Sequence, residues 1–167
     1  MPGIRRTAAL ADSTTLTEAK ARALQEAARA RNIDLSIHRI AKDSEIAAAI
    51  DMAHASGATA LNVFASPMFF GNGRLIMERV AALRLPAMFQ WPAWAEVGGF
   101  IGYGPPLDQL IDLTARFVAS LMRGTKPVDL PVEQPTKFEL WINLKTAKAM
   151  GVAVPEGLLA RADKVIE

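Results

Sequence analysis

The chain has 167 residues, 51% of them hydrophobic, and its formal net charge at pH 7 is only +2. A chain of this length can bury about 70% of the surface that it exposes when unfolded, so we expect one self-sufficient domain over residues 1–167. The basic residues are spread among acidic ones, which argues against a nucleic-acid partner. Cysteine is absent, so disulfides, thiolate metal sites and cysteine nucleophiles are excluded.

Two segments could be mistaken for export or membrane signals. The arginine pair Arg5–Arg6 precedes an apolar run that is too short for the core of a signal peptide, so we expect a cytoplasmic protein if residue 1 is the natural start. The apolar tract from Leu85 to Tyr103 is interrupted by two prolines, a glutamine, a glutamate and glycines. We therefore expect no membrane span.

Short apolar runs alternate with amphipathic stretches over the first half of the chain. The runs predict strands at 4–11, 33–40, 58–65 and 85–89, and the stretches predict helices at 15–31, at 44–56 and around 76–83. Thr15 and Glu18 have the spacing of a capping box, so Thr15 is expected to cap the first helix. The apolar face predicted for that helix consists of Leu16, Ala19, Ala23, Ala27 and Ala30, with Leu24 beside them. This alternation predicts an α/β fold with a doubly wound, mainly parallel sheet.

The pattern changes after Phe89. A short helix or turn is predicted at 91–99 and a short strand at 100–104. The pair Pro105–Pro106 then opens a long helix that runs to Arg123. Its apolar stripe consists of Leu107, Leu110, Ile111, Thr114, Phe117, Val118 and Leu121. A crossover bounded by prolines, one strand and two short helices complete the prediction.

The stretch from Leu130 to Gly151, followed by Val154–Pro155 and residues 158–167, resembles the C-terminal end of the ABC transporter substrate-binding family that includes tryptophan/tyrosine-type receptors. Members have two α/β lobes with the solute between them. The resemblance implies one lobe of a type I periplasmic-binding-protein-like fold and a function without catalysis. It also implies an amino acid or similar small organic acid as ligand, an ABC permease as a possible partner, and a periplasmic setting. The first lobe is expected to be missing here.

In the resembled family, the segment matching residues 100–123 crosses back to pack on the first lobe. We expect residues 100–123 to pack instead on a second copy of the chain and to form a homodimer. An alternative is that the helix folds back on its own sheet. Another is that the helix at 106–123 binds a different protein, as an interaction module does.

Candidate ligand-binding residues lie in the loops predicted after three of the strands, at 12–15, 66–70 and 90–94. Ligands of open α/β sheets bind at the carboxyl ends of strands, near the free amides of helix starts. The candidates are Ser13, Thr14, Ser66, Met68, Phe69 and Trp91. Each has a plainer reading: the hydroxyls as turn and cap residues, and the apolar side chains as core or edge packing.

Catalytic chemistry finds little support. His38 and His54 have no neighbours at metal-ligand spacing, and we recognise no nucleophile elbow, phosphate loop or zinc motif. We therefore predict no catalytic residue, no metal and no cofactor. A flavodoxin-like cofactor protein or enzyme remains an alternative because the hydroxyl-rich loop at 12–15 could cradle a phosphate, although it lacks the glycine that such loops use.

Overall fold

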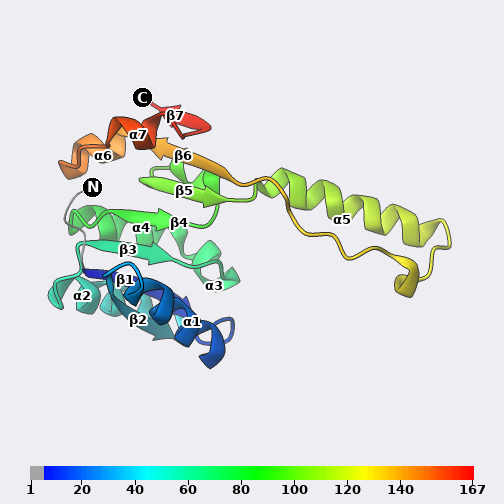
Figure 1. The fold of residues 1–167 in the computed structure, drawn as a ribbon, viewed down its shortest axis with the longest axis horizontal. Coiled ribbons are helices and arrows are strands. Elements are labelled where there is room, and N and C mark those ends of the chain that lie inside the picture. The colour runs from blue at the N-terminus through cyan, green and yellow to red at the C-terminus, as the bar shows by residue number, and fades with distance from the viewer. Residues whose placement is uncertain (1–5) are drawn as a thin grey trace.

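A computed structural model describes residues 6–167 and shows one mixed sheet with helices on both faces (Figure 1). The elements in chain order are β1 (Arg6–Asp12), α1 (Glu18–Arg29), β2 (Asp34–Ile40), the 3-10 turn η1 (Asp43–Glu45), α2 (Ile46–Ala55), β3 (Ala60–Val63), α3 (Pro67–Gly71), α4 (Gly73–Ala82), β4 (Ala87–Phe89), η2 (Pro92–Ala95), β5 (Ile101–Gly104), α5 (Leu107–Met122), η3 (Pro127–Asp129), β6 (Glu139–Asn143), α6 (Leu144–Met150), α7 (Glu156–Leu159) and β7 (Lys164–Ile166). Positions 4 and 5 of the predicted first strand lie outside the described residues.

The sheet has seven strands in the order β2-β1-β3-β4-β5-β6-β7. All neighbouring pairs are parallel except β5 and β6, which run antiparallel. Chain order reverses at β1, as it does in doubly wound sheets, so the carboxyl ends of β1 and β3 lie side by side. The predicted α/β class with a doubly wound, mainly parallel sheet is confirmed.

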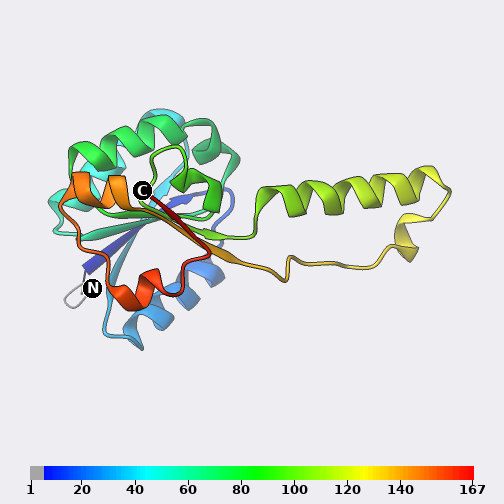
Figure 2. The ribbon, with the colours of Figure 1, turned by 90° about the horizontal axis from the view of Figure 1, so that it is seen from above.

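The main core lies on one face of the sheet, under α2 and α4. Leu10, Leu61 and Phe89 of the strands pack there with Ile50 and Ile76 of the two helices. The opposite face carries α1 and α7 (Figure 2), which lie at the two ends of the sheet (Figure 1). Strand residues therefore alternate between a closely packed face and a more open one.

The first helix begins later than predicted and turns a different side to the sheet. Thr17 caps α1 by accepting a hydrogen bond from the Lys20 amide, whereas the Thr15 hydroxyl donates to the carbonyl of Asp12. The predicted capping box is therefore wrong, because the turn after β1 uses Thr15 for itself. Ala21 is buried and Leu24 packs beside it. The alanines of the predicted face are exposed, namely Ala19, Ala23, Ala27 and Ala30.

The C-terminal end adds a strand, whereas the sequence predicted only one strand and two short helices after the crossover. Asn143 caps α6 by accepting a hydrogen bond from the Thr146 amide, and Gly151 ends that helix in the left-handed conformation at φ 71°. After α7, Lys164–Ile166 pairs with β6 as β7. The edge of β6 offers unpaired backbone groups, and pairing with them outweighs helix propensity in so short a segment.

Residues 105–138 form a projecting arm between β5 and β6 (Figures 1 and 2). The helix α5 has no buried residue among the described part of the chain. An ion pair of 3.3 Å joins Arg116 to Glu133 of the returning segment, and the Tyr103 and Phe138 rings lie 6.0 Å apart at the base. The alternative in which the helix folds back on its own sheet is therefore wrong.

Candidate functional site

A buried carboxylate organises the carboxyl end of β1. Asp12 is 4% exposed and ends the strand. Its Oδ1 accepts hydrogen bonds from the Thr14 amide at 2.8 Å and from the Thr14 hydroxyl at 2.7 Å. Its Oδ2 accepts from the Ser66 hydroxyl at 2.5 Å. Asp12 thus ties the turn after β1 to the segment after β3.

Ser66 joins this carboxylate to the start of a short helix. It is 6% exposed, and its Oγ accepts a hydrogen bond of 3.1 Å from the Met68 amide while donating to Asp12. Residues 66–70 were predicted as a loop, but Pro67–Gly71 form α3 with Ser66 as the N-cap. A serine cap followed by a proline at the first helical position is a strong helix start, so the correction has a simple sequence signal.

Hydrogen bonds set the charge of Asp12. The Ser66 hydroxyl and then the Thr14 hydroxyl lower the pKa of Asp12 below its ordinary value, and they outweigh burial, which acts in the opposite direction. The group therefore stays ionised at neutral pH. A fixed negative charge lies just beneath the exposed turn at Ser13–Thr14.

The backbone amides of this turn are already engaged. Those of Thr15 and Leu16 donate to the Asp12 carbonyl, that of Ser13 donates to the Ile40 carbonyl, and that of Thr14 donates to the Asp12 carboxylate. Capture of a ligand by free amides of this loop, as the sequence suggested, therefore does not fit. The side-chain hydroxyls of Ser13 and Thr14 are the groups that reach the surface.

The apolar candidates on α3 differ in how deeply they are buried. Phe69 is 2% exposed and packs in the main core, and Met68 is half-buried against the same core. Phe70, which the sequence analysis did not select, is instead exposed on α3. A helix start rather than a loop explains the difference, because successive helical residues point about 100° apart and only one of two neighbouring aromatics can face the core.

Two cavities lie at this end of the sheet. One of about 530 Å³ is lined by Thr15, Leu16, Lys20, Ala23, Leu24, Phe64, Ala65 and Gln90. The other, of about 500 Å³, is lined by Ala65, Ser66, Pro67, Phe70, Trp91 and Leu107. Ala65 borders both, and its amide donates to Gln90 Oε1 at 2.8 Å.

Trp91, which follows β4, is one of the residues that line the apolar cavity. Its neighbour Trp94 is buried and stacks on Phe89 with ring centroids 5.0 Å apart, while Phe70 meets the edge of Trp94 at 6.1 Å. Trp94 therefore supports the wall that Phe70 and Trp91 present. Two tryptophans close in sequence thus have different roles.

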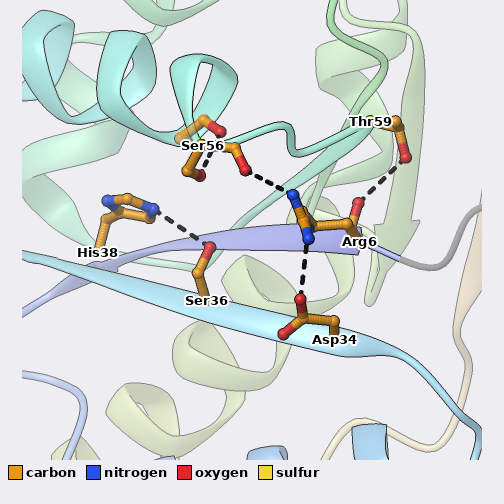
Figure 3. Close-up of polar contacts among 7 residues, drawn as sticks. Arg6, Asp34, Ser36, His38, Ser56 and Thr59 are labelled. Atoms are coloured by element: carbon orange, nitrogen blue, oxygen red, sulfur yellow. Dashed lines mark hydrogen bonds and ion pairs between the residues drawn. The ribbon is translucent and has the colours of Figure 1, made fainter.

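The histidines lie away from this site. His38 is on the edge strand β2, with Nε2 3.3 Å from the Ser36 hydroxyl, and burial lowers its pKa (Figure 3). In the same view, Arg6 donates to Asp34 at 3.3 Å and to the Ser56 carbonyl at 3.0 Å, at the amino ends of the strands. These contacts hold the sheet together at the end opposite the candidate site.

Within residues 6–167, no group of three or more histidine or acidic side chains has the geometry of a metal site. In the same range, no helix is both long enough and apolar enough to cross a membrane.

Solved proteins with the same fold include an ABC domain bound to L-Trp and a substrate binding protein. The complex of an ABC domain with L-Trp from Streptococcus pneumonia has a TM-score of 0.84 at 22% identity, covering 99% of this chain and 56% of that one. A conserved domain protein from Vibrio cholerae gives 0.83 at 21%, with the same coverages. A substrate binding protein with adhesive properties from Clostridium difficile gives 0.68 at 16%, covering 99% and 55%.

This chain therefore spans just over half the length of each of these three proteins. A comparison with curated proteins gave no match. The family model described as ABC transporter substrate binding protein matches residues 1–166, so the chain belongs to that family.

Proposed function

We propose that the chain binds an amino acid, or a similar small organic acid, at the carboxyl ends of β1, β3 and β4, and releases it unchanged. The observation that carries this proposal is the exposed hydroxyl pair Ser13–Thr14, held over ionised Asp12 beside a cavity walled by Phe70 and Trp91. A polar anchor next to an apolar wall is the usual composition of a small-molecule site.

Each part of an amino acid has a matching group here. The Thr14 hydroxyl commits its hydrogen to Asp12 at 2.7 Å, so it can offer only lone pairs to a ligand and suits an ammonium group. The negative charge of Asp12 beneath it also attracts an ammonium group. Lys20 borders the neighbouring cavity and can attract a carboxylate. Phe70 and Trp91 offer ring faces to an apolar side chain.

Calorimetric titration of the purified chain with L-Trp, L-Leu and L-Glu tests this site. Binding of an apolar amino acid, weakened at least tenfold by Trp91→Ala and by Thr14→Ala, is the expected result. Ala93→Ser is the matched control, because Ala93 is exposed beside Trp91 and lies outside the cavity that Ser66, Phe70 and Trp91 share. A free ligand at 100 times its Kd also stabilises the fold by about 2.7 kcal/mol. No heat and no thermal stabilisation with any of the three would refute the proposal.

The chain also forms a homodimer through residues 100–123 in this proposal. The exposed apolar residues of α5 are Leu107, Ile111, Val118, Leu121 and Met122, with Ile111 60% and Met122 84% exposed. Covering such side chains yields about 1.5–3 kcal/mol each, and the sum approaches the net stability of a whole domain, about 5–15 kcal/mol. Light scattering at micromolar concentration should give twice the chain mass.

Binding of this kind would serve solute transport. Members of a family of ABC transporter substrate binding proteins deliver solutes to a permease, and a permease is the corresponding partner of this chain. Co-purification with a permease encoded nearby, strengthened by the bound amino acid, is the expected result. A permease that ignores the loaded chain would count against this partner.

A further inference from the structure

Gln90 is a polar side chain on the wall of a largely apolar cavity. It follows β4 directly, at the end of the sheet where α3 also lies (Figure 1). The cavity is the one of about 530 Å³ beside α1, called here the α1 cavity, and its other lining residues are Thr15, Leu16, Lys20, Ala23, Leu24, Phe64 and Ala65. A few polar groups placed in an apolar wall are the usual means by which a site selects its ligand.

Two glycines of β5 fix the backbone at Gln90. A Cβ on Gly104 would lie 2.0 Å from the Gln90 carbonyl oxygen, and one on Gly102 would lie 2.6 Å from the Trp91 carbonyl oxygen. Only glycine lets two backbones approach so closely. The segment 90–91 therefore rests directly on β5, and the sheet sets the point from which the Gln90 side chain starts.

The two polar atoms of the Gln90 side chain have different surroundings. The Ala65 backbone amide lies 2.8 Å from Oε1. A backbone N–H can only donate, so the atom that faces it must be the oxygen, and the orientation of the side-chain amide follows. Among residues 6–167 this is the one hydrogen bond of the Gln90 side chain. Both hydrogens of Nε2 are therefore available to a ligand.

Lys20 and Gln90 supply the side-chain donors of the α1 cavity. The Thr15 hydroxyl commits its hydrogen to the Asp12 carbonyl at 3.2 Å, so it can only accept, and the other lining side chains are apolar. Lys20 brings a charge on a long side chain exposed on α1, whereas Gln90 brings two N–H groups from a fixed place. Donors on two elements suit a carboxylate, which only accepts hydrogen bonds.

Resting on the proposed function, we infer that Gln90 is the specificity-determining residue for the α-carboxylate of the bound amino acid. Its Nε2 donates a hydrogen bond to a carboxylate oxygen, and the charge of Lys20 adds attraction. Because Oε1 is tied to the Ala65 amide, the side chain does not turn over to present an acceptor. A neutral carboxamide in the same place lacks the charge and binds more weakly.

Gln90→Glu exchanges the donor for an acceptor at nearly constant shape. One oxygen of the new side chain still accepts from the Ala65 amide, while the other takes the place of Nε2. Calorimetric titration at about pH 6, where the ligand amines and the new carboxylate are all charged, compares L-Trp with L-tryptophanamide. Wild type should prefer L-Trp. The variant should bind L-Trp at least tenfold more weakly and should prefer L-tryptophanamide, whose NH2 group can donate to the new oxygen. L-Leu and L-leucinamide replace this pair if wild type binds L-Leu more tightly.

Gln25→Glu is the matched control. It makes the same exchange and adds the same charge on α1, at an exposed residue outside the wall of the α1 cavity. Both affinities should stay within about twofold of wild type. Urea unfolding of each variant confirms that it is folded before titration.

A second readout uses wild type alone and does not depend on how Gln90→Glu folds. The side-chain NH2 signals of Gln90 in ¹H–¹⁵N spectra should shift on saturation with L-Trp, and far less on saturation with tryptamine, which lacks the carboxylate. Three results would each overturn the role of Gln90 while the solute site stands: equal weakening of L-Trp and L-tryptophanamide in Gln90→Glu, unchanged affinity for both, or NH2 signals that bound L-Trp leaves unmoved. A wild type that binds no amino acid would overturn the proposed function, and this inference with it.

Discussion

Replacing Ser66 with alanine tests whether the Asp12–Ser66 contact holds the candidate site in place. The hydroxyl donates to Asp12 Oδ2 at 2.5 Å and accepts from the Met68 amide at 3.1 Å, and both side chains are buried. Alanine removes both hydrogen bonds without adding bulk. The change therefore isolates the polar contribution of a single oxygen atom.

Two terms set the magnitude. Loss of an N-cap costs about 1 kcal/mol, and loss of a hydrogen bond to a charged buried group costs about 1.5–3 kcal/mol. We expect Ser66→Ala to lower the free energy of unfolding by about 3 kcal/mol. In a chain of this length that corresponds to a drop of about 6–12 °C in Tm.

The assay is urea unfolding followed by circular dichroism at several pH values. The folded pKa of Asp12 lies below its unfolded value, so its contribution is fully present above about pH 4 and is lost as pH falls through the folded pKa. Ser66 is the largest cause of that lowering, so the difference between wild type and Ser66→Ala should shrink below about pH 4.

Ser13→Ala is the matched control, because Ser13 is an exposed serine of the same region. It should change stability by less than about 0.5 kcal/mol. A loss of that small size for Ser66→Ala, at every pH, would refute the claim that the contact organises the site.

Three further changes test other parts of the fold. Thr17→Ala should cost about 1 kcal/mol in urea unfolding as a lost helix cap and Thr15→Ala clearly less; the reverse order would restore Thr15 as the cap. Gly104→Ala should cost at least about 2 kcal/mol, since its Cβ would lie 2.0 Å from the Gln90 carbonyl oxygen; unchanged stability would contradict that close approach. Burial lowers the folded pKa of His38, so the wild type should lose stability as pH falls below about 6.5. His38→Leu should flatten that slope between pH 7.5 and 5, and an unchanged slope would assign it to another group.

Periodicity predicted the central strands and helices because burial dominates there. The run at 58–65 is apolar on both sides and became β3, and the run at 85–89 became β4. Where two residues could each cap the same helix, the sequence pattern predicted the wrong one. Thr15 and Thr17 both suit a cap, and the choice depended on the hydrogen bonds that the Asp12 carbonyl accepts. The sequence alone does not show where the Asp12 carbonyl lies relative to the two threonines.

The site was predictable as a region and less so as individual side chains. Strand order places the segments after β1, β3 and β4 at one edge, which follows from the doubly wound topology. Which of Phe69 and Phe70 faces the core depends on α3 being helical. Lys20 could be recognised as a lining residue of the site only once the position of α1 was known. The contact between Asp12 and Ser66 joins residues 54 positions apart, a separation that no local pattern reveals.

The arm leaves the sheet after β5 and returns to its immediate neighbour β6, with Gly104 paired to Glu139 at its base. The chain therefore closes the excursion on itself, and the sheet does not rely on the arm for any strand. Since α5 buries nothing among the described residues, its amide hydrogens should exchange faster than those of β1 and β3, which exchange at a rate set by global unfolding. Substitutions on the arm can thus change its surface without altering the free energy of unfolding of the sheet.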